Sequence, residues 1–143
     1  MPTVEDAIAL ARRSHSGQVD KAGEAYISHP LRVMAAMETE DERMVAVLHD
    51  VVEDTDVTVA DLVNAGYPDA VVQAVALLTK PEHEDYFDYV RRVGQNPLAR
   101  KVKLADLRDN MNLERIAQPT EKDHRRLERY RQALQVLGEA ETS

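Results

Sequence analysis

Apolar residues recur at helical spacing along the chain, in short segments separated by glycine and proline. Residues three and four positions apart share one face of a helix, whereas a half-buried strand would alternate apolar and polar residues. Val71, Val72, Val75 and Leu78 follow the helical spacing although valine favours strands. The pattern therefore predicts an all-α fold.

Capping signals divide the chain into seven or eight expected helices. Capping boxes are expected at Thr3, Thr58 and Thr120, and Asn96 with Pro97 begins the longest helix. The helix over 41–54 has a dense apolar stripe and should be the most buried. The expected spans are 3–17, 30–38, 41–54, 58–66, 68–78, 85–93, 96–116 and 120–137.

The composition suits one compact helical bundle, a single domain over residues 1–143. The absence of cysteine excludes disulfides and cysteine-based metal or nucleophile sites, and it favours a cytoplasmic location. A net charge of −8 disfavours nucleic acid and anionic membranes as partners. Neither a signal peptide nor a membrane-spanning run is expected.

Titratable side chains interrupt the apolar pattern of the most buried expected helix. His49, Asp50, Glu53 and Asp54 point at about 0°, 100°, 40° and 140° around it, so they share one arc of its surface. Buried like charges need a cation among them, and a divalent metal would supply it. On this helix alone, a partly exposed face with its carboxylates in solvent is an equally good interpretation.

Two further interruptions supply more candidate ligands. In VKLADLRDNMNL, Lys103, Asp106 and Asn110 share one helix face. In AYISHP, His29 lies at a loop-to-helix junction, where its side chain can project inward. The resulting imidazole and carboxylate set suits Mn²⁺, Fe²⁺ or Zn²⁺ better than Ca²⁺, although an oxygenase would use similar ligands. The candidate metal ligands are His29, His49, Asp50 and Asp106.

These motifs resemble those of the HD-domain phosphohydrolases, in particular the hydrolase domains of RelA/SpoT alarmone enzymes and the small alarmone hydrolases. The similarity runs from about His15 to Leu113, through HSGQ, GEAYISHP, LHDVVEDT, Thr79-Lys80 and VKLADLRDNMNL. It implies an all-α bundle of the HD-domain type. The family's metal ligands fall on the four candidate ligands given above.

The resemblance also implies a reaction, the removal of the 3′-pyrophosphate from guanosine tetra- or pentaphosphate with Mn²⁺ as the usual ion. A metal-activated water would attack the phosphoryl group. The family's Glu-Asp pair corresponds to Glu53 and Asp54, which would orient that water and accept its proton.

Substrate-binding residues follow in the same way. The family's sugar-contacting Asn corresponds to Asn110, and Lys21, Lys103 and Lys80 are the cations expected near phosphates. In the alarmone hydrolases an Arg nine residues before the HP histidine stacks on guanine, whereas this chain has Asp20 there. An ammonium group cannot stack as a guanidinium does, so a neighbouring lysine is no direct substitute.

Two other functions stay open: a nucleotidase or phosphatase for another small phosphorylated metabolite, and a non-catalytic module that binds metal or nucleotide. The Glu-Asp pair argues against the module, because metal binding alone does not need it. In each case the expected partner is a small nucleotide-like molecule, and the oligomeric state is left open. Several other residues have a functional alternative, but a structural role is favoured for each. His15 could lie near the site or make a helix-end hydrogen bond, and Arg108 could bind phosphate or pair with Asp109. Tyr86, Tyr89 and Arg91 could line a substrate mouth, but a solvated helix with its tyrosines at the core edge is favoured, and His83 and His124 are expected on the surface.

Overall fold

The structure is a computed structural model that describes residues 2–19, 23, 25–111 and 120–142. Within these residues it is helical, apart from one isolated antiparallel bridge between Val19 and Ala25. None of the described helices is long and apolar enough to span a membrane. The all-α prediction is confirmed. The helices are α1 (Val4–Ser14), α2 (Ser28–Ala35), α3 (Glu40–Leu48), α4 (Val51–Asp54), α5 (Val59–Asn64), α6 (Asp69–Leu78), α7 (Tyr86–Val93), α8 (Pro97–Asn110) and α9 (Glu121–Thr142).

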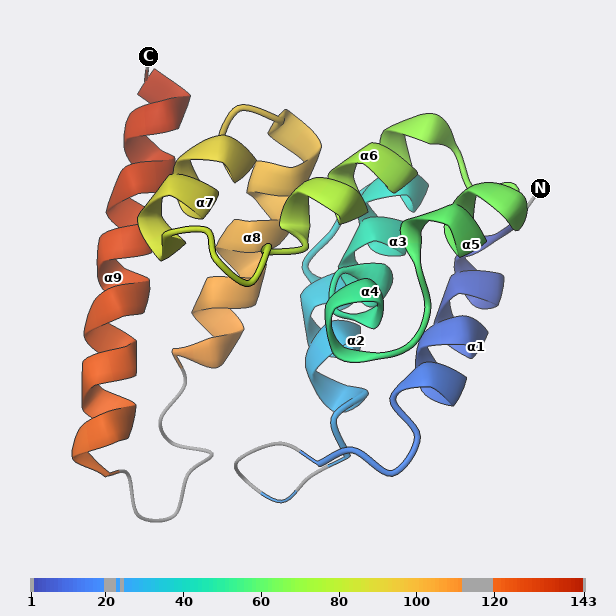
Figure 1. Ribbon diagram of the computed structural model, residues 1–143, viewed down its shortest axis with the longest axis horizontal. Helices are drawn as coiled ribbons and strands as arrows, with labels where there is room; N and C mark the ends of the chain where they lie inside the picture. Colours follow the sequence, from blue (N-terminus) through green and yellow to red (C-terminus); the bar gives the residue numbers. More distant parts are fainter. Residues whose placement is uncertain (1, 20–22, 24, 112–119, 143) are drawn as a thin grey trace.

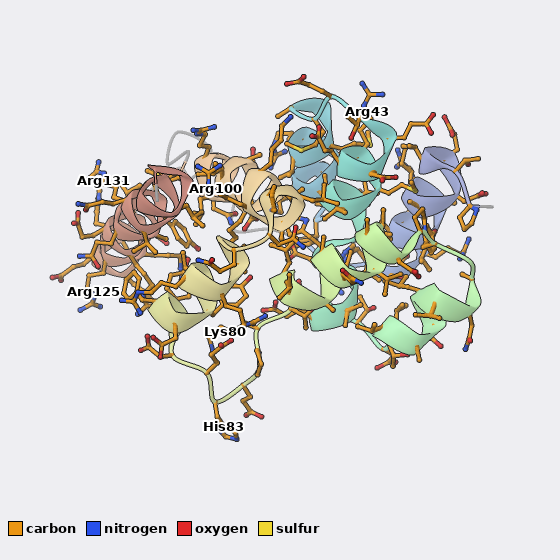
Figure 2. The ribbon with its side chains drawn as sticks, turned by 90° about the horizontal axis from the view of Figure 1, so that it is seen from above. Arg43, Lys80, His83, Arg100, Arg125 and Arg131 are labelled. Carbon is orange, nitrogen blue, oxygen red and sulfur yellow. The ribbon has the colours of Figure 1, made fainter. Side chains whose placement is uncertain are left out.

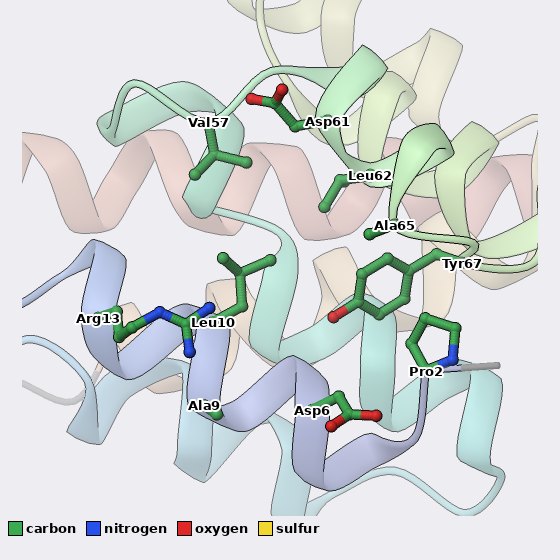
Figure 3. A pocket seen from close by; sticks show the side chains of 10 residues that line it. All are labelled: Pro2, Asp6, Ala9, Leu10, Arg13, Val57, Asp61, Leu62, Ala65 and Tyr67. Atoms are coloured by element: carbon green, nitrogen blue, oxygen red, sulfur yellow. The ribbon is translucent and has the colours of Figure 1, made fainter.

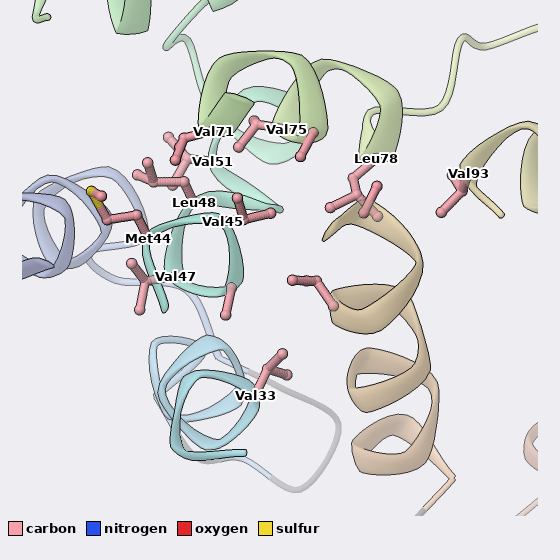
Figure 4. Close-up of a cluster of buried hydrophobic side chains, with 14 of the residues drawn as sticks. Val33, Met44, Val45, Val47, Leu48, Val51, Val71, Val75, Leu78 and Val93 are labelled. Carbon is pink, nitrogen blue, oxygen red and sulfur yellow. The ribbon is translucent and has the colours of Figure 1, made fainter. Parts of the chain in front are cut away.

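Helix α3 is the centre of the packing. Every residue from Met44 to Leu48 is buried, and α3 contacts α1, α2, α6 and α8. Val71 and Val75 of α6 approach α3 from one side, and Val33 of α2 lies on the other (Figure 4). Helices α7, α8 and α9 pack together at the end of the molecule away from α1 and α5 (Figure 1). The expected burial of this segment is therefore confirmed for α3.

Capping residues begin several of the helices, as expected. The boxes of Thr3 with Asp6 and Thr58 with Asp61 are formed, and Asn96 caps α8 with Pro97 directly after it. Thr120 exchanges hydrogen bonds with Asp123 at the start of α9. An additional box, Thr39 with Glu42, begins α3. These bonds satisfy backbone N–H groups that a helix start would otherwise leave without partners.

The single helix expected over 41–54 is wrong, because the structure interrupts it between α3 and α4. Nδ1 of His49 lies 2.5 Å from the carbonyl oxygen of Ala46. An uninterrupted helix would offer that carbonyl to the N–H of Asp50. The His49 imidazole therefore replaces the backbone N–H of Asp50 as the hydrogen-bond partner of the Ala46 carbonyl. The helix is interrupted at His49 and Asp50.

Other helix ends differ by a few residues. Helix α1 ends at Ser14, before Gly17, and α2 begins at Ser28, so Pro30 lies in its first turn. A proline is tolerated there because the first N–H groups of a helix have no intrahelical acceptor. Helix α8 ends at Asn110, residues 112–116 of its expected span lie outside the described residues, and α9 extends beyond 137.

Candidate metal centre

Four side chains from three regions of the chain converge at one point. His29 comes from the first turn of α2, His49 and Asp50 from the break between α3 and α4, and Asp106 from the buried side of α8. Each offers one ligand atom, and these atoms lie within 4.8 Å of one another. Three of the four are buried, and Asp50 is partly exposed. The candidate ligands thus form a group that could hold a divalent cation.

The two imidazole rings are oriented as metal ligands. Nε2 of His29 lies 2.8 Å from Oδ1 of Asp106, and Nε2 of His49 lies 3.1 Å from the same oxygen. On its other side, His29 places Nδ1 2.6 Å from Oδ2 of Asp109. Nδ1 of His49 faces the Ala46 carbonyl, as described above. With the proton on Nδ1, each ring directs the lone pair of Nε2 into the group, so the residues fit a divalent ion.

The electrostatics of the group favour positive charge at its centre. Burial opposes protonation of His49, but the carboxylates of Asp50 and Asp106 outweigh it and raise the pKa of His49 well above its usual value. Burial also opposes ionisation of Asp106, yet Lys103 and the two histidines hold its pKa well below the usual value. The carboxylates therefore stay charged and attract protons to the rings. A divalent cation would displace those protons on binding.

Lys103, Asn110 and Tyr26 surround the ligands. Nζ of Lys103 lies 3.0 Å from Oδ2 of Asp106, and the Asn110 amide donates to Oδ1 over 3.2 Å. The Tyr26 hydroxyl donates to Oδ2 of Asp50 over 2.5 Å. Burial opposes the charge of Lys103, but Asp106 outweighs it and raises the pKa of the ammonium group. Lys103 is therefore a permanent cation beside the candidate ligands.

A pocket of about 170 Å³ opens beside the group. Binding cavities for drug-sized molecules usually measure about 300–1,000 Å³. The volume of this pocket is therefore on the scale of a phosphate or pyrophosphate group. Its lining residues are Tyr26, His49, Asp50, Glu53, Leu78, Lys80, Tyr86, Tyr89, Lys103, Asp106, Asn110 and Tyr130.

The two predicted catalytic carboxylates differ in position. Glu53 lines the pocket, and its Oε2 accepts a hydrogen bond from the Lys80 backbone N–H over 3.3 Å. Asp54 follows it on α4 and is not among the described lining residues. Both residues are exposed, but partial desolvation and the nearby charge of Asp50 raise the pKa of both carboxyl groups. Both are thereby better proton acceptors than ordinary carboxylates.

The three lysines predicted to bind phosphate differ in their positions relative to the pocket. Lys103 reaches the pocket beside Asp106. Lys80 lines the pocket, with its Nζ 3.1 Å from the Pro81 carbonyl. Lys21 lies outside the described residues, and so does Asp20 at the position of the family's guanine-stacking Arg.

Several residues outside the group have the structural positions expected of them. His15 is buried at the end of α1, where Nδ1 lies 3.0 Å from Oε1 of Gln18. Arg91 is exposed and pairs with Asp88. His83 lies on the loop between α6 and α7, pointing away from the molecule (Figure 2), and His124 is also exposed. The tyrosines of α7 do more than pack at the core edge, since both line the pocket.

Asp109 and Arg32 were missed as residues of the site by sequence reasoning. The sequence interpretation pairs Asp109 with Arg108, whereas the structure sets its carboxylate against His29 and Arg32. A signal was present: Asp109 follows Asp106 by three residues, and Arg32 follows His29 by three. Such spacing places each pair on one helix face.

A second cavity, of about 580 Å³, lies between α1 and α5 (Figure 3). Much of its wall is apolar, including Leu10, Leu62 and the ring of Tyr67. Its carboxylates, Asp6 and Asp61, are engaged in the capping boxes of α1 and α5. No histidine is among its described lining residues, so the group beside α8 is the candidate functional site.

Comparison with known proteins supports the fold and the motifs. The chain is 36% identical over 110 residues to a guanosine-3′,5′-bis(diphosphate) 3′-pyrophosphohydrolase of Vibrio cholerae, a match that covers 74% of this chain and 15% of the relative. It is 34% identical over 122 residues to the bifunctional (p)ppGpp synthase/hydrolase SpoT of Escherichia coli, covering 76% of this chain and 17% of that protein. A solved structure described as a metazoan ortholog of SpoT that hydrolyzes ppGpp superposes with a TM-score of 0.76 at 25% identity. The chain belongs to the RelA/SpoT-like HD-domain family.

This RelA/SpoT-like assignment confirms the resemblance that the motifs indicated. The superposition covers 94% of this chain and 84% of the solved one, so the likeness extends over the whole helical arrangement. No protein-family model matches the chain. The chain spans only 15% and 17% of the length of the two curated relatives given above.

Proposed function

We propose that this RelA/SpoT-like HD domain is a metal-dependent phosphohydrolase that removes the 3′-pyrophosphate of guanosine tetraphosphate or pentaphosphate. The observation that carries the proposal is the convergence of four ligand atoms beside a small pocket that contains Lys103 and Glu53. The Vibrio cholerae relative, named for the same reaction, supports the substrate. The single domain and the cytoplasmic location stay predictions from the sequence.

The resident ion is proposed to be Mn²⁺, because mixed imidazole and carboxylate ligands suit it. His29, His49, Asp50 and Asp106 would hold it. Such an ion supplies Lewis-acid activation of water and of a phosphoryl oxygen.

The chain's own residues perform the remaining tasks. Glu53, on the pocket wall, orients the attacking water and takes its proton, with Asp54 beside it on α4. As the water oxygen bonds to phosphorus, the bond from phosphorus to the ribose 3′ oxygen breaks. That oxygen leaves, takes a proton from solvent to become the 3′ hydroxyl, and pyrophosphate is released. Lys103 has three ammonium donors, so it can contact Asp106 and still neutralise a phosphate oxygen. Asn110 is the proposed contact to the sugar.

The test is turnover of guanosine tetraphosphate by the purified protein with Mn²⁺. It should run beside a panel of nucleoside mono-, di- and triphosphates and nicotinamide dinucleotide phosphates. Pyrophosphate release from the tetraphosphate at an ordinary enzymatic rate, abolished by chelation, is the expected result. Turnover confined to other members of the panel would refute the alarmone substrate and keep the phosphohydrolase.

A nucleotidase or phosphatase acting on another small phosphorylated metabolite is the second candidate. The pocket volume of about 170 Å³ favours it, because a site that holds the phosphate group alone places few demands on the rest of the molecule. The Asp at position 20 points the same way, since it cannot stack on guanine as the family's Arg does. The substrate panel separates the two candidates.

The double variant Glu53→Gln with Asp54→Asn tests the catalytic roles. We expect hydrolysis to fall by about 10²–10⁴-fold, because general-base catalysis contributes on that scale. Mn²⁺ binding should persist, because neither residue is among the four ligands. Titration calorimetry and a turnover assay measure the two effects separately. The exposed Asp56→Asn is the control, and full turnover in the double variant would contradict the assignment.

A further inference from the structure

Helices α2 and α8 face each other with two pairs of polar residues, each pair separated by one turn. His29 and Arg32 lie on α2, and Asp106 and Asp109 lie on α8. The two helices are in contact. The pairs therefore meet across the helix interface.

One imidazole is held between the two carboxylates. Nε2 of His29 lies 2.8 Å from Asp106, and Nδ1 lies 2.6 Å from Asp109. The guanidinium group of Arg32 makes a bidentate contact with Asp109: Nε donates to Oδ1 over 2.8 Å, and a terminal nitrogen donates to Oδ2 over 3.1 Å. The side chains of His29, Asp109 and Arg32 are 5%, 15% and 34% exposed, so the contacts run outward from the buried centre.

The two histidines obtain their orientation in different ways. The Nδ1 atom of His49 faces the backbone carbonyl of Ala46 within its own helix. The Nδ1 atom of His29 depends on a side chain from another helix. A hydrogen-bond acceptor at Nδ1 fixes the tautomer and the ring plane of a ligating histidine. A bidentate guanidinium contact holds a carboxylate in one orientation.

We propose that Asp109, held by Arg32, is a positioning residue that sets His29 as a metal ligand. The inference rests on the proposed function only in that His29 binds a metal, and it adds two residues outside the family's ligand motif. Asp109 is not among the four candidate ligands. It acts through the imidazole.

Mn²⁺ titration calorimetry without substrate tests this role on the full chain. Loss of an outer partner of a ligating histidine typically weakens metal affinity by about 10–100-fold, which is the loss expected for Asp109→Ala. Asp109→Asn should lose less, because its amide oxygen still accepts the Nδ1 proton. Arg32→Gln should also lose less, because the carboxylate remains. Asp88→Asn, which breaks an exposed Arg–Asp pair on α7, is the matched control and should bind Mn²⁺ as the unaltered chain does.

The visible absorption spectrum of the Co²⁺-loaded protein is a second measurement, because it reports the ligand geometry and not the overall stability. We expect it to change in Asp109→Ala and not in Asp88→Asn. Unchanged Mn²⁺ affinity and an unchanged spectrum in folded Asp109→Ala would overturn the proposal. If that variant does not fold, unchanged values in Asp109→Asn and Arg32→Gln would do so.

Turnover separates this inference from the proposed function. An unaltered chain that binds Mn²⁺ but hydrolyses no phosphate ester would refute the function, and the affinity series would still decide the role of Asp109. Loss of turnover in Asp109→Ala with intact Mn²⁺ affinity would overturn the positioning role and leave the function standing.

Discussion

Asp106 lies between both imidazoles of the candidate centre and the ammonium group of Lys103. One of its oxygens faces both imidazoles, and the other accepts a hydrogen bond from Lys103. Both members of the Lys103–Asp106 pair have little exposure. A buried ion pair of this kind adds little net stability, but removing one partner leaves the other charge uncompensated.

Asp106→Ala should therefore have two effects. The free energy of unfolding without metal should fall by about 3–5 kcal/mol, because Lys103 loses its partner. Most of the Mn²⁺-dependent rise in melting temperature should disappear with the ligand. Thermal unfolding with Mn²⁺ and with a chelator measures both.

A second variant separates these effects. Asp106→Leu with Lys103→Met removes both buried charges, so it should recover part of the stability and none of the metal dependence. A metal-dependent rise that survives in either variant would show that Asp106 is not a ligand.

At the scale of the helix, features set by residues close together in the sequence could be predicted, and contacts between distant residues could not. The boxes of Thr3 and Thr58 were predictable because a cap and its partner lie three residues apart. The break at His49 was not, because helical spacing does not show that an imidazole will displace a backbone donor. The ligand set came from buried polar positions and the family resemblance. The contact of Asp109 with His29 joins residues 80 positions apart, beyond the reach of any local pattern.

Glu42 ties the start of α3 to α8 and makes that link sensitive to pH. It accepts hydrogen bonds from the backbone N–H groups of Glu38 and Thr39 and from Lys101 of α8. Burial opposes its charge, but these donors outweigh it and lower the pKa of Glu42. The folded-state pKa lies below the unfolded one, so the stabilisation is present at neutral pH and is lost as the pH falls through the folded value.

Glu42→Gln should consequently destabilise the protein at neutral pH and progressively less on acidification below the usual glutamate pKa. Denaturant unfolding at a series of pH values measures the difference. The exposed Glu40→Gln in the same turn is the control. A difference between the unaltered chain and Glu42→Gln that does not change with pH would contradict the prediction.

For the molecule as a whole, the centre joins segments from both halves of the chain. Its candidate ligands come from α2, the α3–α4 break and α8, all of which pack around the buried core. A bound ion would connect these segments directly, whereas α5 supplies none of the ligands. Metal should therefore protect some helices against local opening more than others.

Hydrogen exchange with and without a chelator tests this expectation. Chelation should speed exchange in α2 and α8, where ligands are lost, and leave α5 nearly unchanged as an internal reference. Uniform acceleration over all described helices would indicate a global loss of stability. No acceleration anywhere would indicate that the four residues hold no tight ion.

The polar residues on α2 and on α8 are spaced equally, by about one turn. Their contacts across the interface therefore form in only one axial register of the two helices. Sliding α2 by three residues, about 4.5 Å, would bring Arg32 opposite Asp106 in place of His29. A guanidinium group stays protonated and offers no lone pair to a metal. A misdocked pair of helices would thus assemble no centre at all, so the chain completes its chemistry only after early and late segments have found their native alignment.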